Sequence, residues 1–190
     1  MAVRGEPSNL GSRVSTTDAL TTVPSVASTT TTPSTSIAVP PGGSLTAREV
    51  AAETAWASSK MAFYRAALLD DPQYPALLAT LVPGGPVEVH SIAYLTGLAS
   101  AGVRGPPTWR VGNGRVVSIG TTRARVEGCL FDTGSVLKST GAPAPPSLGG
   151  GAGLTASDAI LVLEDSRWLV LSDDVKAVSS SKEPGPCRGF

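Results

Sequence analysis

The first strong pattern of apolar and polar positions predicts a helix that begins at Thr46. The Thr46 hydroxyl can accept a hydrogen bond from the backbone N–H of Glu49, and the Glu49 side chain can reach back to Thr46, which is a capping box. Leu45 can pack against Val50 across this start. The apolar residues that follow at helical spacing are expected to form one broad buried face. They are Val50, Ala57, Met61, Tyr64 and Leu68, widened by Trp56 and Phe63, before Asp-Asp-Pro at 70–72 ends the helix. Such an aromatic face either packs against a sheet or forms the lid of a ligand cavity.

Two further helices are expected over residues 75–82 and 87–101. Pro-Gly-Gly-Pro at 83–86 separates them, and Gly102 is placed to end the later one. That helix carries two neighbouring apolar faces, which are formed by Ile92, Leu95 and Ala99 and by Val87, Tyr94 and Leu98. It also carries His90, the only histidine of the chain, which has no obvious carboxylate or cysteine partner nearby in the sequence.

After residue 107 the apolar residues alternate, which indicates β-strands. Trp109 and Val111 precede Gly-Asn-Gly at 112–114, a strong hairpin signal, so residues 116–119 are expected to return as the paired strand. Segment 122–131 should follow as a strand with one apolar and one polar, solvated face. The apolar face holds Ala124, Val126 and Leu130, and the polar face holds Arg123, Arg125, Glu127 and Cys129.

A long loop and a last hairpin complete the expected sheet. Residues 139–153 are rich in Pro, Gly and Ala, and their Gly-Gly-Gly at 149–151 lacks the lysine and the following helix of a phosphate-binding loop. Residues 159–163 and 168–171 are the most apolar segment of the chain, so we expect them to pair and to lie centrally in the sheet.

The N-terminal residues 1–44 are expected to form a disordered tether. About half of residues 15–40 are Ser or Thr, with three prolines and almost no charge, so the segment cannot bury enough apolar surface to fold. Such tracts are typical of plain linkers and of extracellular stalks, some of them O-glycosylated. The first ten residues have no apolar export signal. Either the protein is cytosolic, or its start codon is assigned inside the tether, downstream of the true signal.

Composition narrows the classes of partner. A formal net charge of zero with 16% charged residues provides no basic field for nucleic acid, which is therefore not an expected partner. No apolar run approaches the roughly 18 residues that a membrane-spanning helix needs. The length favours a single domain over residues 45–187 with a short tail at 188–190. No motif indicates a cofactor, a metal site or a nucleophile with its base, so we expect none of these.

The order of these elements, together with a few residues, points to a known fold. The polar-alternating strand ends in Gly-Cys-Leu-Phe-Asp at 128–132, a Pro/Gly loop follows, and Trp168 and Cys187 come late. In these features the chain resembles the NTF2-like (cystatin-like) superfamily, and more narrowly uncharacterised exported or lipid-anchored actinobacterial proteins of that kind. The resemblance covers about residues 46–187. It implies an α+β fold in which N-terminal helices pack against a curved antiparallel β-sheet that forms a cone.

The resemblance leaves the use of the cone open, because this fold does not determine function. Its mouth can hold a small molecule, form a dimer or have no chemical role. Catalytic members, such as SnoaL-like cyclases and ketosteroid isomerases, place an acid or base in the cone. His90, Tyr64 and Asp132 are the candidates in this sequence. None stands in a motif that assigns a catalytic residue, so a structural role is expected for each.

The two cysteines favour a disulfide. Cys129 and Cys187 lie 58 residues apart, without a histidine pair to complete a zinc site and without a C-x-x-C motif. Outside the cell they are expected to pair, which would stabilise the fold by roughly 4 kcal/mol in the loop-entropy description. In a cytosolic protein both would stay free thiols.

Two classes of function follow. The preferred one is a non-catalytic domain at the cell envelope or outside the cell, which binds a protein partner or a small hydrophobic ligand through the open side of the sheet. This class also allows a homodimer that forms through the open side of the sheet. The charges of Arg123, Arg125 and Glu127 could equally keep that side solvated. The alternative is a small SnoaL-like or isomerase-like enzyme, in the cytoplasm, that uses a buried acid such as Asp132, or His90 as a base, in the cone cavity. The absence of a paired acid and base from the sequence favours the first class.

Overall fold

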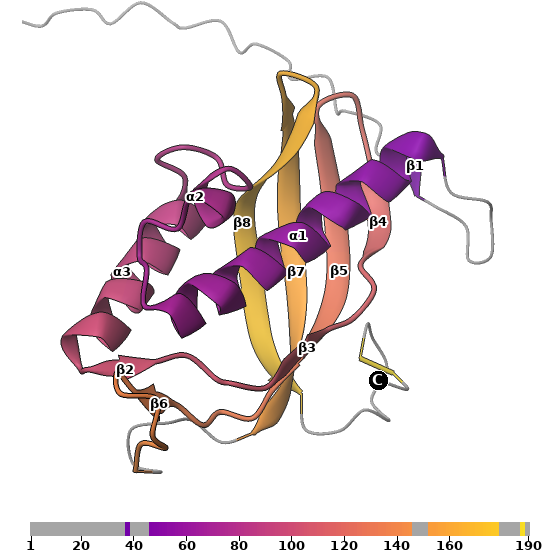
Figure 1. Ribbon diagram of the computed structural model, residues 1–190. Coiled ribbons are helices and arrows are strands. Elements are labelled where there is room, and N and C mark those ends of the chain that lie inside the picture. Colours follow the sequence, from indigo (N-terminus) through magenta and orange to yellow (C-terminus); the bar gives the residue numbers. More distant parts are fainter. Residues whose placement is uncertain (1–36, 39–45, 146–151, 179–186, 189–190) are drawn as a thin grey trace, which may run out of the picture. The chain divides into compact units, whose positions relative to one another are not determined.

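A computed structural model describes residues 37–38, 46–145, 152–178 and 187–188 (Figure 1). The expected tether lies outside the described residues, except for strand β1 (Ile37–Ala38), which the sequence did not predict. Leu45, the middle of the long loop, the segment before Cys187 and the last two residues lie outside them as well.

Three helices precede the main strands, as predicted. They are α1 (Ala47–Leu69), α2 (Pro75–Leu78) and α3 (Pro86–Ser100). Both hydrogen bonds of the capping box form at the start of α1, since the Glu49 N–H donates to Thr46 Oγ1 at 3.3 Å and the Thr46 N–H to Glu49 Oε2 at 2.6 Å. Asp70 ends this helix in the left-handed conformation, and Gly102, also left-handed with φ +66°, follows α3.

Helix α2 is a single turn, so the prediction of a helix to residue 82 was wrong at its end. The chain leaves the helix and pairs with strand β8 (Arg167–Val178). The Val170 N–H donates to the Thr80 carbonyl at 2.9 Å, and the Val82 N–H donates to the Val170 carbonyl at 3.1 Å. These bonds cover part of the edge that β8 would otherwise expose.

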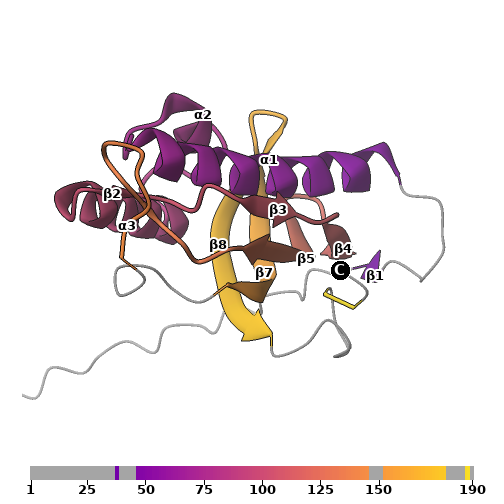
Figure 2. The same cartoon turned by 60° about the horizontal axis from the view of Figure 1, so that its bottom comes forward.

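The α+β class with a curved antiparallel sheet is confirmed, in the order that the resemblance implied. The main sheet runs β1-β4-β5-β7-β8, with β3 also paired to β5, and a second sheet joins β2 to β6. The strands are β2 (Val103–Arg104), β3 (Trp109–Val111), β4 (Arg115–Ile119), β5 (Arg123–Asp132), β6 (Leu137–Lys138), β7 (Gly153–Glu164) and β8 (Arg167–Val178). Both views show α1 lying across one face of this sheet, and Figure 2 shows how strongly β8 bends.

The predicted hairpin at 112–114 was wrong. Strands β3 and β4 both pair antiparallel with β5, β3 near its end and β4 near its start, so the chain runs on along one edge without reversing. The Gly112 N–H continues this pairing with a bond of 2.8 Å to the Cys129 carbonyl. Gly114 allows a close approach, because a Cβ there would come within 2.8 Å of Trp56.

The buried face of α1 agrees with the predicted one only in part. Trp56 and Tyr64 are buried, as predicted, but Val50 and Met61 are 48% and 46% exposed. The stripe that faces the sheet combines small residues with polar ones: Ala52, Trp56, Ser59, Lys60, Tyr64, Ala66 and Ala67. In α3, likewise, Ser91 and Leu95 are buried while Tyr94 is 47% exposed. A pattern search for apolar residues misses such faces because it counts Lys and Ser as solvent positions.

The last hairpin forms as predicted, with longer strands. Asp165 and Ser166 both have positive φ in its two-residue turn, as a hairpin of type I′ requires. Strand β7 lies inside the sheet, but β8 is last in the strand order, so the central position was predicted correctly for only one of them.

None of the helices among the described residues combines the length and the apolar character that a membrane-spanning segment needs.

Candidate functional site

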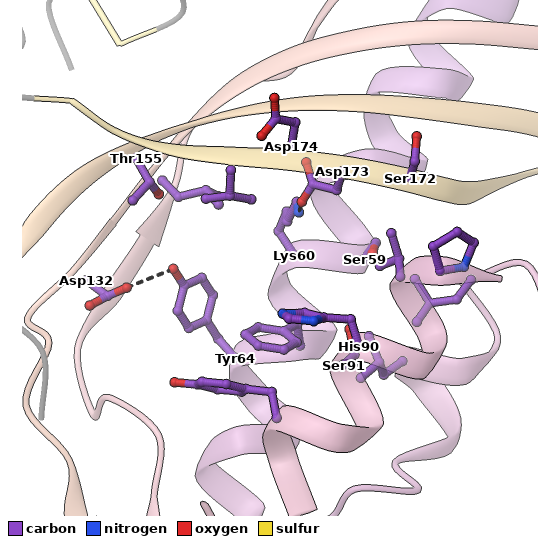
Figure 3. A pocket seen from close by; sticks show the side chains of 18 residues that line it. Ser59, Lys60, Tyr64, His90, Ser91, Asp132, Thr155, Ser172, Asp173 and Asp174 are labelled. Atoms are coloured by element: carbon purple, nitrogen blue, oxygen red, sulfur yellow. Dashed lines mark hydrogen bonds and ion pairs between the residues drawn. The ribbon is translucent and has the colours of Figure 1, made fainter. Parts of the chain in front are cut away.

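A cavity of about 680 Å³ lies between α1, α3 and the inward face of β5, β7 and β8 (Figure 3). The three residues that the sequence singled out, Tyr64, His90 and Asp132, all line it. They come from α1, α3 and the end of β5. The fold therefore brings together side chains whose sequence positions gave no sign of proximity.

Strand alternation places the acidic residues on this wall. In β5 every second residue faces α1, so Asp132 continues the row of Val126 and Leu130. In strand β8, simple alternation does not place Asp173 on the cavity wall, and a bulge is needed. Its pairing with β7 skips Leu171, and this bulge changes which residues face inward, from Val170 before it to Asp173 after it. Without the bulge, Asp173 would face the opposite side of the sheet.

Tyr64 and Asp132 form the polar pair at one side of the cavity. The Tyr64 hydroxyl donates to Asp132 Oδ2 at 3.1 Å, and the backbone N–H of Gly134 donates to Oδ1 at 2.7 Å. Burial and the neighbouring Asp132 charge raise the pKa of Tyr64 well above its ordinary range. The Tyr64 hydroxyl therefore remains a hydrogen-bond donor at any physiological pH.

Aromatic rings pack on the Tyr64 side of this pair. Trp109 stacks on Tyr64 with ring centroids 5.2 Å apart, and Phe63 lies 5.8 Å from both Tyr64 and Tyr94. Burial and, second, the charge of Asp132 also raise the pKa of Tyr94. One end of the cavity is therefore an aromatic cluster in which the hydroxyl of Tyr64 binds a carboxylate.

A second polar network lies on the cavity wall one turn of α1 away from Tyr64. The Lys60 ammonium forms an ion pair with Asp173, and the two side chains are only 10% and 7% exposed. Ser157 Oγ donates to the other oxygen of Asp173 at 2.5 Å, and the Trp56 indole N–H donates to Ser157 Oγ at 3.0 Å. Each of these four side chains thus has a polar partner, as buried polar groups generally do.

Sequence reasoning missed Lys60 and Asp173. Their positions are 113 residues apart, and only the bulge in β8 makes Asp173 face Lys60. One signal was present, since Lys60 lies four residues from both Trp56 and Tyr64 and therefore on the same side of α1. A lysine between two buried aromatic residues predicts a buried partner for its charge.

His90 is exposed on α3, next to buried Ser91, and Figure 3 shows its ring projecting into the cavity. No hydrogen bond of its side chain to another described residue orients the ring. An acid–base pair that includes His90 is thus not preformed among these residues. Within the described part of the chain, His, Cys, Asp and Glu side chains also nowhere gather in a group that could hold a metal ion.

The other face of the sheet is polar and charged, as predicted. Arg125 binds both oxygens of Asp158, at 2.7 and 2.6 Å, and also forms an ion pair with Glu127. Cys129 belongs to this face but is buried, because a disulfide joins it to Cys187. The pair is the one expected from the sequence.

The chain is similar in structure to several solved proteins. One, of unknown function with a cystatin-like fold, comes from Nostoc punctiforme; it is 13% identical, with 72% of this chain and 96% of that chain covered and a TM-score of 0.45. An uncharacterised protein with a cystatin-like fold from Caulobacter vibrioides is 11% identical over 69% of this chain and 92% of its own, with a TM-score of 0.45. A third, from Streptomyces avermitilis, is described as a proposed dehydratase from the NTF2-like family; the match is 14% identical over 71% of this chain and 100% of that chain, with a TM-score of 0.41. No family model and no curated protein matches the sequence.

Proposed function

We propose that this chain is a binding domain for a small organic molecule, which it holds in the cavity between α1, α3 and the sheet. One observation carries the proposal: a cavity of about 680 Å³ into which three separate elements direct Tyr64, His90 and Asp132. Ligand sites typically measure roughly 300–1,000 Å³ and combine apolar walls with a few convergent polar groups. Leu77, Leu81 and Phe63 contribute apolar walls of that kind here.

The polar groups of the cavity favour the binding of a ligand over catalysis. The raised pKa keeps Tyr64 protonated, so it acts as a donor, and Lys60 is held in its ion pair with Asp173. The outer sheet face carries the ion pairs of Arg125, which favour solvent there over a protein partner or a second copy of the chain. The cavity is therefore the preferred place for a ligand.

An enzyme of the SnoaL-like or isomerase-like kind is the second candidate. It is favoured by the Asp132 carboxylate, which faces the cavity and could accept a proton from a bound substrate. The Asp132→Asn variant separates the two candidate functions. If the protein is an enzyme, the variant should lose the turnover of a bound substrate, whereas a binding domain shows no turnover in either form.

We also propose that the protein belongs to the NTF2-like superfamily and works at the cell envelope or outside the cell. The long first helix across a bent antiparallel sheet supports the first statement. The disulfide between Cys129 and Cys187 supports the second, because such bonds persist in oxidising compartments. Intact mass of the protein from its native host should rise by about two mass units on reduction if the bond forms there.

A cavity-filling variant tests the binding function. Val87 and Val89 lie on the same helix, but Val87 lines the cavity while Val89 is 60% exposed. In a thermal-shift screen of small organic molecules, compounds that raise the Tm of the natural protein should still raise that of Val89→Trp and fail with Val87→Trp. If no compound raises the Tm, or if Val87→Trp responds like Val89→Trp, the cavity is not the binding site.

A further inference from the structure

We propose that the cavity selects an organic cation, such as a substituted ammonium group, over neutral or anionic molecules of the same shape. This inference rests on the proposed binding function and names its ligand class. Two independent features of the cavity carry it, its balance of charge and its aromatic walls.

The first feature is a negative charge that no cation among the described residues compensates. Three aspartates line the cavity, Asp132, Asp173 and Asp174, but the side chain of Asp174 is 61% exposed and points away from it (Figure 3). Among the described residues, Lys60 neutralises Asp173 and Lys176 pairs with Asp174. The bonds that Asp132 accepts from the described residues come from the hydroxyl of Tyr64 and the backbone of Gly134, which are neutral donors. Among the residues that the structure describes, its charge is therefore held at the cavity wall by neutral donors, with no cation paired to it.

The second feature is the aromatic cluster on the same side. Phe63, Tyr64 and Tyr94 line the cavity, and the ring centroid of Phe63 lies 5.8 Å from those of the other two. Trp109 stacks on Tyr64 and fixes its plane. The face of an aromatic ring carries negative potential, so it attracts a cation that lies within about 6 Å of the ring centre.

The two features lie next to each other, because the carboxylate accepts a hydrogen bond from one of the rings. Asp132 is bonded to Tyr64, and its charge also contributes to the raised pKa of Tyr94. A cation at this end of the cavity would meet both a formal negative charge and aromatic faces. An anion would meet the same groups with the opposite sign of interaction, and the ammonium that the described residues place on the wall, that of Lys60, is already paired.

Three probes of nearly equal shape separate charge from size. Choline is the cation, 3,3-dimethylbutan-1-ol is its neutral carbon analogue, and 3,3-dimethylbutanoate is the anion. Binding to the full chain is followed by NMR through the amide resonances of α1 and α3, at pH 8, where imidazoles are generally neutral. Choline should bind about tenfold more tightly than the alcohol, and the anion more weakly than the alcohol.

Two pairs of variants assign the preference to its residues. Asp132→Asn keeps an acceptor for Tyr64 but removes the charge, so the advantage of choline over the alcohol should fall severalfold. Asp174→Asn removes a carboxylate that is already paired and should leave it unchanged. Tyr94→Leu should weaken choline binding, whereas Tyr94→Phe retains an aromatic face and should keep it. Thermal unfolding of each variant checks that it folds.

The outcomes separate this inference from the binding function. If the alcohol or the anion binds as tightly as choline, or if Asp132→Asn keeps the full advantage, the preference for a cation is wrong while the cavity still binds ligands. If none of the three probes moves the resonances of the cavity wall, the cation inference fails as well. In that case a positive result in the thermal-shift screen would still support the binding function, and a negative one would overturn both.

Discussion

Gly128 lies directly against the indole ring of Trp56. A Cβ built on this glycine would come within 2.1 Å of the ring carbon Cη2, which is closer than side-chain atoms approach one another in proteins. Trp56 is fully buried, and its indole N–H is bonded to Ser157 on β7. The absence of a side chain at Gly128 thus determines how closely α1 can approach the sheet.

Gly128→Ala is therefore expected to destabilise the fold. The added methyl group must displace a buried ring that is tied by its hydrogen bond, and overpacking of this kind costs about 1–3 kcal/mol. Gly97→Ala is the control, because a Cβ at Gly97 would meet nothing within 4 Å. Because Gly97 lies within α3, where alanine has the higher helix propensity, this substitution should stabilise the fold by about 0.5–1 kcal/mol. Urea unfolding measures both, and equal stability of Gly128→Ala and the natural protein would contradict the tight contact.

The ion pair between Lys60 and Asp173 leads to a second prediction. Because both side chains are almost fully buried, Lys60→Met leaves the charge of Asp173 without its partner and should cost about 3 kcal/mol. Replacing both, as Lys60→Met with Asp173→Leu, removes the unpaired charge and should recover much of that loss. Urea unfolding of the single and double variants tests this, with Lys176→Met as an exposed control that should change little. A double variant that is less stable than the single one would show that the pair is not the cause.

The sequence predicted those parts of the fold that depend on near neighbours. The capping box at Thr46 lies within four residues, and the alternation of β5 places Ala124 and Val126 on the inward face without knowledge of any other element. Asp132 shares that alternation, so its position facing α1 could also have been predicted. The order of helices and strands follows from the same local signals.

The predictions that were wrong concern residues whose role depends on distant parts of the chain. Gly114 carries a turn signal, but here it makes room for Trp56, which lies on another element. Val170 and Asp173 face the same side only because of the bulge at Leu171, which no local pattern indicates. Lys60 is buried only because Asp173 lies opposite it. Tertiary contacts thus override local patterns at the cavity wall.

The disulfide yields a third prediction. Thiol titration of the denatured, unreduced protein should find no free thiol, and reduction should release those of Cys129 and Cys187. Replacing both cysteines by alanine should lower the free energy of unfolding by about 4 kcal/mol, since the bond closes a long loop in the unfolded chain. Natural protein that has been reduced should lose a similar amount. Two titratable thiols without reduction would contradict the bond.

The hydrogen bond between Tyr64 and Asp132 predicts how stability responds to alkaline pH. Burial, then the charge of Asp132 and their hydrogen bond, raise the pKa of Tyr64 in the folded protein above the value of about 10 that tyrosine has in an unfolded chain. Above pH 10 the unfolded state has released this proton while the folded state still holds it. Fewer bound protons in the unfolded state mean that stability falls as pH rises.

Tyr64→Phe removes this titration. The contribution of Tyr64 is fully present below pH 10 and is lost above it, so the natural protein should lose stability more steeply than Tyr64→Phe between about pH 9 and 11. Groups that titrate in both proteins, including Tyr94 with its own raised pKa, cancel in the comparison. Urea unfolding at a series of pH values gives the two curves. Parallel curves would mean that Tyr64 ionises as freely in the folded protein as in the unfolded one, and the pairing with Asp132 would then not hold the proton.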